Sequence, residues 1–219
     1  MSIFQGILLG ILQGVAEFLP ISSSGHLTVV QYLFGLEEIP LLFDVFLHLA
    51  TLFAVCLYFW RKIWNLLKVF GRWIARKEPS EEDIAGRKMI IAIILSTIVT
   101  GVLGVVTSKL IPEMSIKVTC AGFLVTALLL IVTAKKEGTE TVVTKKQALF
   151  IGFMQGIGTL PGISRSGSTI AASLFSGVDR KTAGDYSFII SIPAILGAFI
   201  LEVKDLKTDI SSKEKIIQK

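Results

Sequence analysis

The sequence predicts an all-α protein that crosses a membrane several times, and three observations support this fold class. Of the 219 residues, 52% are hydrophobic and only 18% are charged, against about 25% charged in soluble domains. The charges leave long gaps: residues 89–108 hold none, residues 1–36 hold only Glu17 and residues 147–178 hold only Arg165. The last two stretches also match each other. A soluble globule, a disordered chain and a disulfide scaffold are therefore excluded.

Four segments read as complete membrane spans. Apolar stretches of about 20 residues are long enough to cross the roughly 30 Å hydrocarbon core of a bilayer. The predicted spans are 41–60, 89–109, 116–134 and 186–203. Basic residues gather in two predicted loops, at 61–88 and 135–146, which the positive-inside rule places in the cytoplasm. The same rule places 37–40 and 109–117 outside.

Residues 3–36 and 147–178 do not read as simple spans. Proline, glycine and serine interrupt the apolar run around Pro20 in the first segment and around Pro161 in the second. These residue types break a helix, and broken backbone at membrane depth must be buried in protein or line a wet cavity. Each segment therefore predicts two half-helices joined by a loop, a re-entrant hairpin that enters and leaves on one side.

The two broken segments align without gaps at an offset of 142 residues. Seven residues are identical over positions 10–25, for example Gly10 with Gly152 and Gln13 with Gln155. The first hairpin is predicted to enter from outside and the second from inside, which makes an inverted-topology repeat. Such repeats place the ligand site near the midplane. A stripe of Gly6, Gly10 and Gly14 predicts close packing of the first helix.

Ionisable residues inside these apolar segments are the strongest functional signals. A charge at the centre of a membrane helix costs roughly 2.5–3.5 kcal/mol, so Glu17, His26 and Arg165 are expected to act in function. An arginine fork and helix N-termini both suit phosphate, so the stretch 164–169 predicts a phosphate cradle. Glu17 would hold a divalent cation or act as a general base, and Ser23 would be a nucleophile with His26 as its base.

Two other readings of these residues stay open. Glu17 and Arg165 would form a buried ion pair that only locks the hairpins together, and the serines would only satisfy loop backbone. Asp44 and His48 lie four residues apart on the first span. Asp44 is predicted to face the cavity, while His48 is interpreted as a packed histidine or a helix–helix hydrogen-bond partner.

Two motifs resemble those of one enzyme family. Residues 13–27, QGVAEFLPISSSGHL, and residues 161–167, PGISRSG, resemble in order and spacing the two motifs of undecaprenyl-diphosphate phosphatases, the bacitracin-resistance family. The resemblance covers essentially the whole chain. It implies a multi-pass hydrolase of the bacterial inner membrane that cleaves undecaprenyl diphosphate to undecaprenyl phosphate and phosphate. The product is the carrier lipid of peptidoglycan synthesis, the site faces the outer side, and the family is linked to antibiotic resistance.

The resemblance also assigns roles to residues. Catalytic roles fall on Glu17, Ser23, His26 and Arg165, and substrate binding falls on Gln13, Ser24, Gly162, Ser164, Ser166 and Thr169. Three attacking groups stay open: Ser23, His26 and water. Gln13 stands where many members have glutamate, which leaves Glu17 as the ligand of a divalent cation, Mg²⁺ or Ca²⁺. The expected partners are a polyprenyl diphosphate lipid and the bilayer, without nucleic acid; a homo-oligomer is left open. The alternative function is a lipid-phosphate transporter or flippase, because such proteins also use inverted repeats.

The repeat divides one membrane domain, residues 1–219, into three parts. Repeat one covers 1–134, a cytoplasmic linker covers 135–146, and a partial repeat two covers 147–219. Counterparts of the second and third spans would lie near 231–251 and 258–276. We therefore expect the second repeat to be truncated by two helices and the polar segment 204–219 to stay in water.

Overall fold

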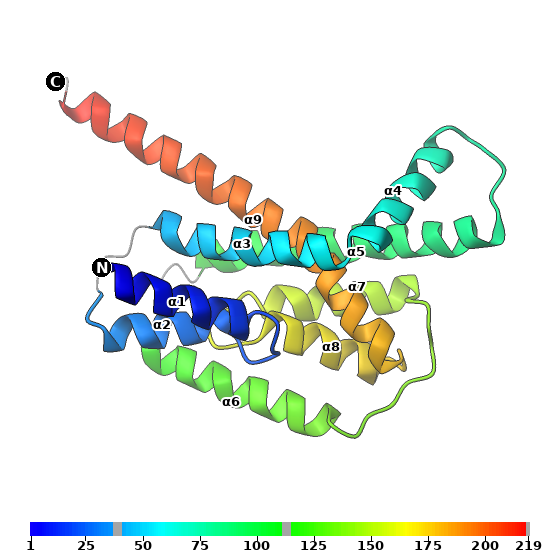
Figure 1. The fold of residues 1–219 in the computed structure, drawn as a ribbon, viewed down its shortest axis with the longest axis horizontal. Coiled ribbons are helices and arrows are strands. Elements are labelled where there is room, and N and C mark those ends of the chain that lie inside the picture. Colours follow the sequence, from blue (N-terminus) through cyan, green and yellow to red (C-terminus); the bar gives the residue numbers. More distant parts are fainter. Residues whose placement is uncertain (37–40, 111–114, 218–219) are drawn as a thin grey trace.

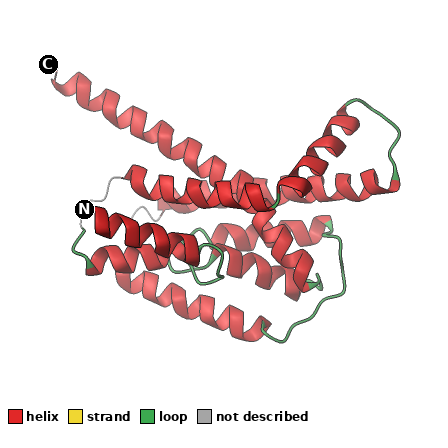
Figure 2. Ribbon diagram, viewed as in Figure 1, coloured by secondary structure: helices red, strands yellow, loops and turns green. Residues whose placement is uncertain are grey.

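The computed structural model describes residues 1–36, 41–110 and 115–217, and the side chains of these residues except 41–42 and 205–217. The described residues form helices and no strand, which confirms the all-α class (Figure 2). The helices are α1 (Ile3–Ala16), α2 (Ser23–Leu33), α3 (Leu41–Tyr58), α4 (Trp60–Ile74), α5 (Glu81–Leu110), α6 (Ile116–Thr133), α7 (Lys145–Ile157), α8 (Arg165–Phe175) and α9 (Arg180–Ile217). The expectations for residues 37–40, and for 111–114 within the predicted turn, lie outside the described residues.

The helices agree with a protein that crosses the membrane several times. Three are long and apolar enough to span it: α5, α6 and the Arg180–Lys204 part of α9. A fourth crossing arises if α3 and α4 are counted as one broken span, although they meet at an angle of 76°. All four predicted spans are therefore helical. The last one extends further than expected, since α9 continues as helix through residues predicted to form a polar tail.

The predicted basic loop at 61–88 is wrong. This segment contains α4 and the first residues of α5, which begins at Glu81 with the Ser80 hydroxyl accepting a hydrogen bond from the Asp83 amide at 3.2 Å. The physical reason is periodicity. Apolar residues recur in α4 at helical spacing with basic residues on another face, so a segment rich in charge is nevertheless an amphipathic helix.

Two pairs of short helices build the centre of the molecule. The longest of the four, α1, has 14 residues and is about 21 Å long, too short to cross a hydrocarbon core of roughly 30 Å. Figure 1 shows the α1–α2 pair and the α7–α8 pair lying tip to tip, so that their two loops meet between α6 and the pair α3 and α5. This arrangement brings the two sequence motifs to one place.

Equivalent residues cap the helices of both pairs. The side chains of Ser2 and Thr144, which lie 142 positions apart, each open a capping box at the start of α1 and α7. The hydroxyls of Ser22 and Ser164, also 142 apart, accept hydrogen bonds from the third residue of α2 and α8, at 3.4 and 3.0 Å. The bounds of α2 and α8 correspond residue for residue at the same offset. Matching local interactions therefore build both helical hairpins.

The glycines of α7 allow close helix packing, whereas those of α1 do not. A Cβ added at Gly152 of α7 would lie 2.6 Å from the Ser96 Cα of α5, so only glycine allows this approach. The prediction for the stripe Gly6, Gly10 and Gly14 is wrong: a Cβ at Gly14 would meet nothing within 4 Å, and one at Gly10 would only touch Leu47 at 3.9 Å. The reason is that no described helix is pressed against that face of α1.

This difference gives a stability prediction at two repeat-equivalent positions. Gly152→Ala is expected to destabilise the protein by about 1–3 kcal/mol, because the methyl group is forced against α5 backbone. Gly10→Ala is expected to be neutral or slightly stabilising, since alanine favours a helix over glycine by about 1 kcal/mol. Thermal unfolding midpoints in detergent measure both. Equal midpoints for the two variants would contradict the packing described here.

Candidate functional site

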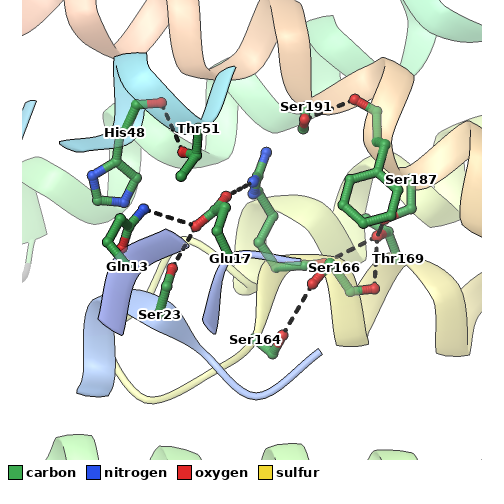
Figure 3. A network of polar contacts seen from close by, with 12 residues as sticks. Gln13, Glu17, Ser23, His48, Thr51, Ser164, Ser166, Thr169, Ser187 and Ser191 are labelled. Atoms are coloured by element: carbon green, nitrogen blue, oxygen red, sulfur yellow. Dashed lines mark hydrogen bonds and ion pairs between the residues drawn. The ribbon is translucent and has the colours of Figure 1, made fainter. Parts of the chain in front are cut away.

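An ion pair joins the tips of the two helical hairpins. Glu17 directly follows α1, Arg165 is the first residue of α8, and a guanidinium Nη2 donates to the Glu17 Oε1 (Figure 3). The Glu17 and Arg165 side chains are 7% and 18% exposed, so the ion pair is largely shielded from water. The expectation that both loops meet at one place is therefore confirmed, and the ion pair left open by the sequence is present.

The other oxygen of the Glu17 carboxylate binds two groups from its own hairpin. Oε2 accepts from the Ser23 hydroxyl at 2.5 Å and from the Gln13 amide at 3.2 Å (Figure 3). Ser23 reaches Glu17 because Ser22 adopts a left-handed backbone, with φ of 71°, which turns the chain sharply into α2. A serine hydroxyl that donates to a buried carboxylate can lose its proton to it as it attacks an electrophile.

Two polar atoms at this site have no partner among the described residues. They are Nη1 of Arg165 and Oε1 of Gln13, and both are buried. Buried polar groups without a protein partner are rare in folded proteins, and they are candidates for binding a ligand, an ion or water. The guanidinium nitrogen suits a phosphate oxygen, and the amide oxygen suits a cation or a hydroxyl.

His26 lies on α2, three residues after Ser23. Its Nδ1 lies 2.8 Å from the Ser22 carbonyl oxygen and donates to it, and its ring meets Phe123 of α6 edge-on with centroids 4.8 Å apart. This leaves Nε2 as the ring nitrogen that can accept a proton. The hydrogen bonds given by the described residues link Ser23 to Glu17, and the pairing of Ser23 with His26 is not among them.

The hydrogen bonds given for four other predicted residues, Ser24, Ser164, Ser166 and Thr169, go to groups outside the ion pair. Ser164 caps α8, and its hydroxyl lies 3.4 Å from that of Ser166. The Thr169 hydroxyl contacts the Ser187 hydroxyl of α9 at 2.6 Å, so it ties α8 to α9 (Figure 3). The Ser24 carbonyl accepts from a hydroxyl one turn later. These contacts match the reading in which several serines satisfy helix and loop backbone.

Gly162 is held by a residue that the sequence did not single out. It has a φ of +87°, and an added Cβ would overlap the Thr119 carbonyl of α6, so glycine is required there. Thr126, also on α6, donates to the Gly162 carbonyl and accepts from the Ser164 amide, both at 2.9 Å. Thr126 thus fixes the loop that ends at Arg165. One threonine in an apolar span carries no sequence signal for this role.

His48 of α3 borders the site on the side of Gln13 (Figure 3). Its Nδ1 donates to the Asp44 carbonyl at 2.8 Å. Asp44 itself accepts from the Gln31 amide at 2.9 Å. The sequence predicted a packing histidine or a helix–helix hydrogen-bond partner, and the hydrogen bond of His48 instead stays within α3.

A divalent cation fits the oxygen atoms available here only in part. Within the described ranges no group of three His, Cys, Asp or Glu side chains could enclose a metal ion. The Glu17 carboxylate already accepts from Arg165, Ser23 and Gln13, and beside it only Oε1 of Gln13 is an unpartnered oxygen. Mg²⁺ is usually held by one or two carboxylates together with substrate phosphates and water. The residues therefore fit a cation that the substrate helps to bind.

Comparisons with known proteins agree with the two motifs. Residues 6–218 match the model of the family described as bacitracin resistance protein BacA. The chain is 53% identical over 207 residues to a protein of Treponema denticola named undecaprenyl-diphosphatase, covering 93% of this chain and 76% of that protein. Proteins of the same name from Desulfosudis oleivorans and Methanosphaera stadtmanae are 43% and 40% identical, over 92% and 95% of this chain and 77% and 79% of their own. The family match and these relatives agree with the two motifs and the helical hairpins, and they show that this chain belongs to the bacitracin resistance protein BacA family.

Proposed function

We propose that this protein is a membrane phosphatase that hydrolyses undecaprenyl diphosphate to undecaprenyl phosphate and inorganic phosphate. The observation that carries the proposal is that Glu17 forms an ion pair with Arg165 and accepts a hydrogen bond from Ser23. A cation, a base and a hydroxyl therefore meet at the two hairpin tips. The names of the relatives support the same substrate. The product is a carrier lipid, so the reaction supplies lipid for cell-wall synthesis.

The first step uses the residues at the hairpin tips. Nη1 of Arg165, which has no partner among the described residues, donates to an oxygen of the terminal phosphate and holds it near Ser23. The Ser23 oxygen attacks the terminal phosphorus while Glu17 takes the hydroxyl proton. The phosphorus–oxygen bond of the anhydride breaks, and undecaprenyl phosphate leaves with the electron pair. Positioning and charge neutralisation do most of the work in such transfers.

The second step releases phosphate from Ser23. A water molecule attacks the phosphoserine, and the free Nε2 of His26 accepts a proton from that water. Glu17 returns its proton to the Ser23 oxygen as the phosphorus–oxygen bond breaks. His26 then gives its proton to solvent, so the enzyme is restored. Each half of the reaction thus has its own base.

Glu17 and Gln13 are proposed to hold a divalent cation, Mg²⁺ or Ca²⁺, together with the diphosphate. When bound, this cation neutralises charge on the diphosphate oxygens as the leaving group departs. The amide of Gln13 is turned so that its nitrogen donates to Glu17 and its oxygen stays free for this purpose.

The two helical hairpins are proposed to be re-entrant and to belong to an inverted repeat. Matching caps and helix bounds at the offset of 142 support a common origin for the two pairs. The basic residues at 61–88 and 135–146 support cytoplasmic positions for those segments. In this arrangement the site opens to the outer side of the bacterial inner membrane, where the diphosphate is bound.

Phosphate release from a polyprenyl diphosphate tests the function directly. Purified protein in detergent is expected to release phosphate in the presence of Mg²⁺ or Ca²⁺. Chelation with EDTA is expected to lower the rate about 100-fold, and added Mg²⁺ to restore it, because the cation supplies several kcal/mol of charge stabilisation. Full activity in EDTA would contradict the cation. Lipid movement across vesicles without any hydrolysis would instead favour a transporter.

A variant of Thr126 tests how the loop is positioned. Thr126→Val is expected to lower kcat about tenfold, because the Gly162 carbonyl and the Ser164 amide each lose a buried hydrogen bond. The matched control is Thr133→Val on the same helix, whose hydroxyl bonds only to carbonyls of its own helix. Phosphate release by both variants is measured at saturating substrate. An equal kcat for the two would exclude a positioning role for Thr126.

A further inference from the structure

The amphipathic helix α4 presents three distinct faces. One face packs on the protein: Val69 is 4% exposed and contacts Gly86 of α5, and the Lys62 ammonium pairs with Asp185 of α9 at 3.1 Å. A second face is apolar and exposed. A third is polar and exposed, and carries Arg61, Asn65 and Lys68. Only the first face is explained by contacts within the described chain.

The apolar exposed face forms a continuous stripe along the helix. Its residues are spaced three or four apart and are 42–68% exposed: Trp60, Trp64, Leu67, Phe70 and Ile74. The stripe begins at an apolar pocket of about 420 Å³, lined by Cys56 of α3 with Trp60, Ile63 and Trp64. Large exposed apolar patches mark surfaces that are covered in the working state.

Cations lie along the border of this stripe. The Arg61 guanidinium lies 5.5 Å from the centre of the Trp60 ring, and the Lys68 ammonium lies 5.8 Å from that of Trp64. At the end of α4, Arg76 and Lys77 line a second pocket of about 510 Å³ together with Trp73, Ile74, Glu78, Pro79 and Arg87. Nε of Arg87 is buried and has no partner among the described residues.

Acidic groups near this surface are fewer, and one of them is already neutralised. Asp83 pairs with Arg72 at 2.5 Å, so neither charge is free for a ligand. Glu78 lines the second pocket, and Glu81 and Glu82 are exposed at the start of α5. The exposed border of α4 itself, at Arg61 and Lys68, holds cations only. Its charge therefore suits an anionic partner.

The bend between α3 and α4 decides which surface this helix meets. If α4 continued α3 through the bilayer, the exposed Arg61, Asn65 and Lys68 would lie in hydrocarbon, which is strongly unfavourable. The angle of 76° instead turns α4 nearly perpendicular to α3 (Figure 1). Helices that lie in a membrane interface have this composition, with tryptophan and leucine on one face and lysine or arginine on another.

We propose that α4 lies in the plane of the membrane interface and binds anionic phospholipids there. The stripe Trp60–Ile74 contacts acyl chains, and Arg61 and Lys68, with Arg76 and Lys77 at the helix end, contact headgroup phosphates. The partner is a lipid surface with net negative charge, to which juxtamembrane lysine and arginine are attracted. This site is separate from the Glu17–Arg165 pair and does not depend on hydrolysis.

Intrinsic fluorescence tests the proposal without any label on the protein. All three tryptophans of the chain, Trp60, Trp64 and Trp73, lie on α4. The full chain is reconstituted in phosphatidylcholine vesicles that contain some phosphatidylglycerol, and quencher groups are attached to the lipids at known depths. Shallow quenchers are expected to act most strongly. Strongest quenching by mid-bilayer quenchers, or quenching by aqueous acrylamide only, would overturn the proposal.

A second arm tests the preference for negative lipid. At equal shallow depth, quencher-bearing phosphatidylglycerol is expected to quench at least about twofold more than quencher-bearing phosphatidylcholine, because it gathers around the cations. Arg61→Glu with Lys68→Glu is expected to abolish this difference. The matched control, Lys145→Glu with Lys146→Glu at the exposed start of α7, makes the same charge change and is expected to keep it. No preference in the unmodified protein, or an equal loss in both variants, would overturn the anionic site.

Discussion

Arg165→Ala is expected to lower phosphate release about 1000-fold. Nη1 of Arg165 is the unpartnered donor at the site, and it acts in a buried position where charge is poorly screened. An arginine that stabilises a transferring phosphoryl group contributes a factor of about 10³–10⁵. Arg165→Lys is expected to recover only part of the loss, since one ammonium cannot hold Glu17 and a phosphate in the bidentate manner of a guanidinium. Initial rates at saturating substrate measure both variants.

Stability must be separated from chemistry in this experiment. Arg165→Ala leaves Glu17 buried without its ion-pair partner, and breaking such a pair costs about 3–5 kcal/mol. The double variant Glu17→Gln with Arg165→Ala removes the unpaired charge and is expected to regain thermal stability but not activity. If the pair only locked the hairpins together, activity would return with stability. That result would contradict the catalytic role of both residues.

Ser23→Ala is expected to lower phosphate release about 1000-fold while leaving the fold intact. The hydroxyl is lost as nucleophile, whereas Glu17 keeps its bonds to Arg165 and Gln13. Acid–base and nucleophilic groups of this kind each contribute factors of about 10²–10⁴. A suitable control is Ser108→Ala, whose hydroxyl is exposed and bonds only to a carbonyl of its own helix. The control is expected to keep wild-type turnover.

The covalent intermediate gives an independent readout for Ser23. Rapid quenching of the wild-type enzyme during turnover, followed by mass spectrometry, is expected to find phosphate on the peptide that contains Ser23. His26→Gln is expected to increase its amount, because the second step loses its base. Wild-type activity in Ser23→Ala would exclude this mechanism and leave water or His26 as the attacking group.

The sequence predicted the large features because they depend on local composition. Long uncharged segments predicted the spanning helices: α6 agrees to within one residue, whereas α5 begins eight residues before the predicted span, and the scarcity of charge singled out Glu17 and Arg165. A charge in an apolar segment is costly wherever the helix ends up, so no tertiary information was needed. The meeting of the two hairpin tips followed from the repeat, whereas the ion pair between them was one of two readings left open.

Other features depend on three-dimensional contacts that composition does not encode. The role of Thr126 arises because α6 happens to pass beside the loop at Gly162. The hydrogen bond from Ser23 to Glu17 depends on the sharp turn into α2 at Ser22, which has a left-handed backbone. The glycines of α1 and α7 look alike in sequence, yet only Gly152 and Gly156 face a neighbouring helix closely. Counting the charges of 61–88 also missed the helical spacing of the apolar residues in α4.

The helical hairpins meet at two equivalent positions that carry different chemistry. Ser23 and Arg165 are the first residues of α2 and α8, and a serine side chain caps each helix, although Ser22 has a left-handed backbone and Ser164 an extended one. Equivalent positions therefore present a hydroxyl in one copy and a guanidinium in the other. A symmetric pair of tips would treat both ends of a diphosphate alike. In the proposed mechanism this difference gives the reaction a direction, because it determines which phosphorus is attacked and which oxygen departs.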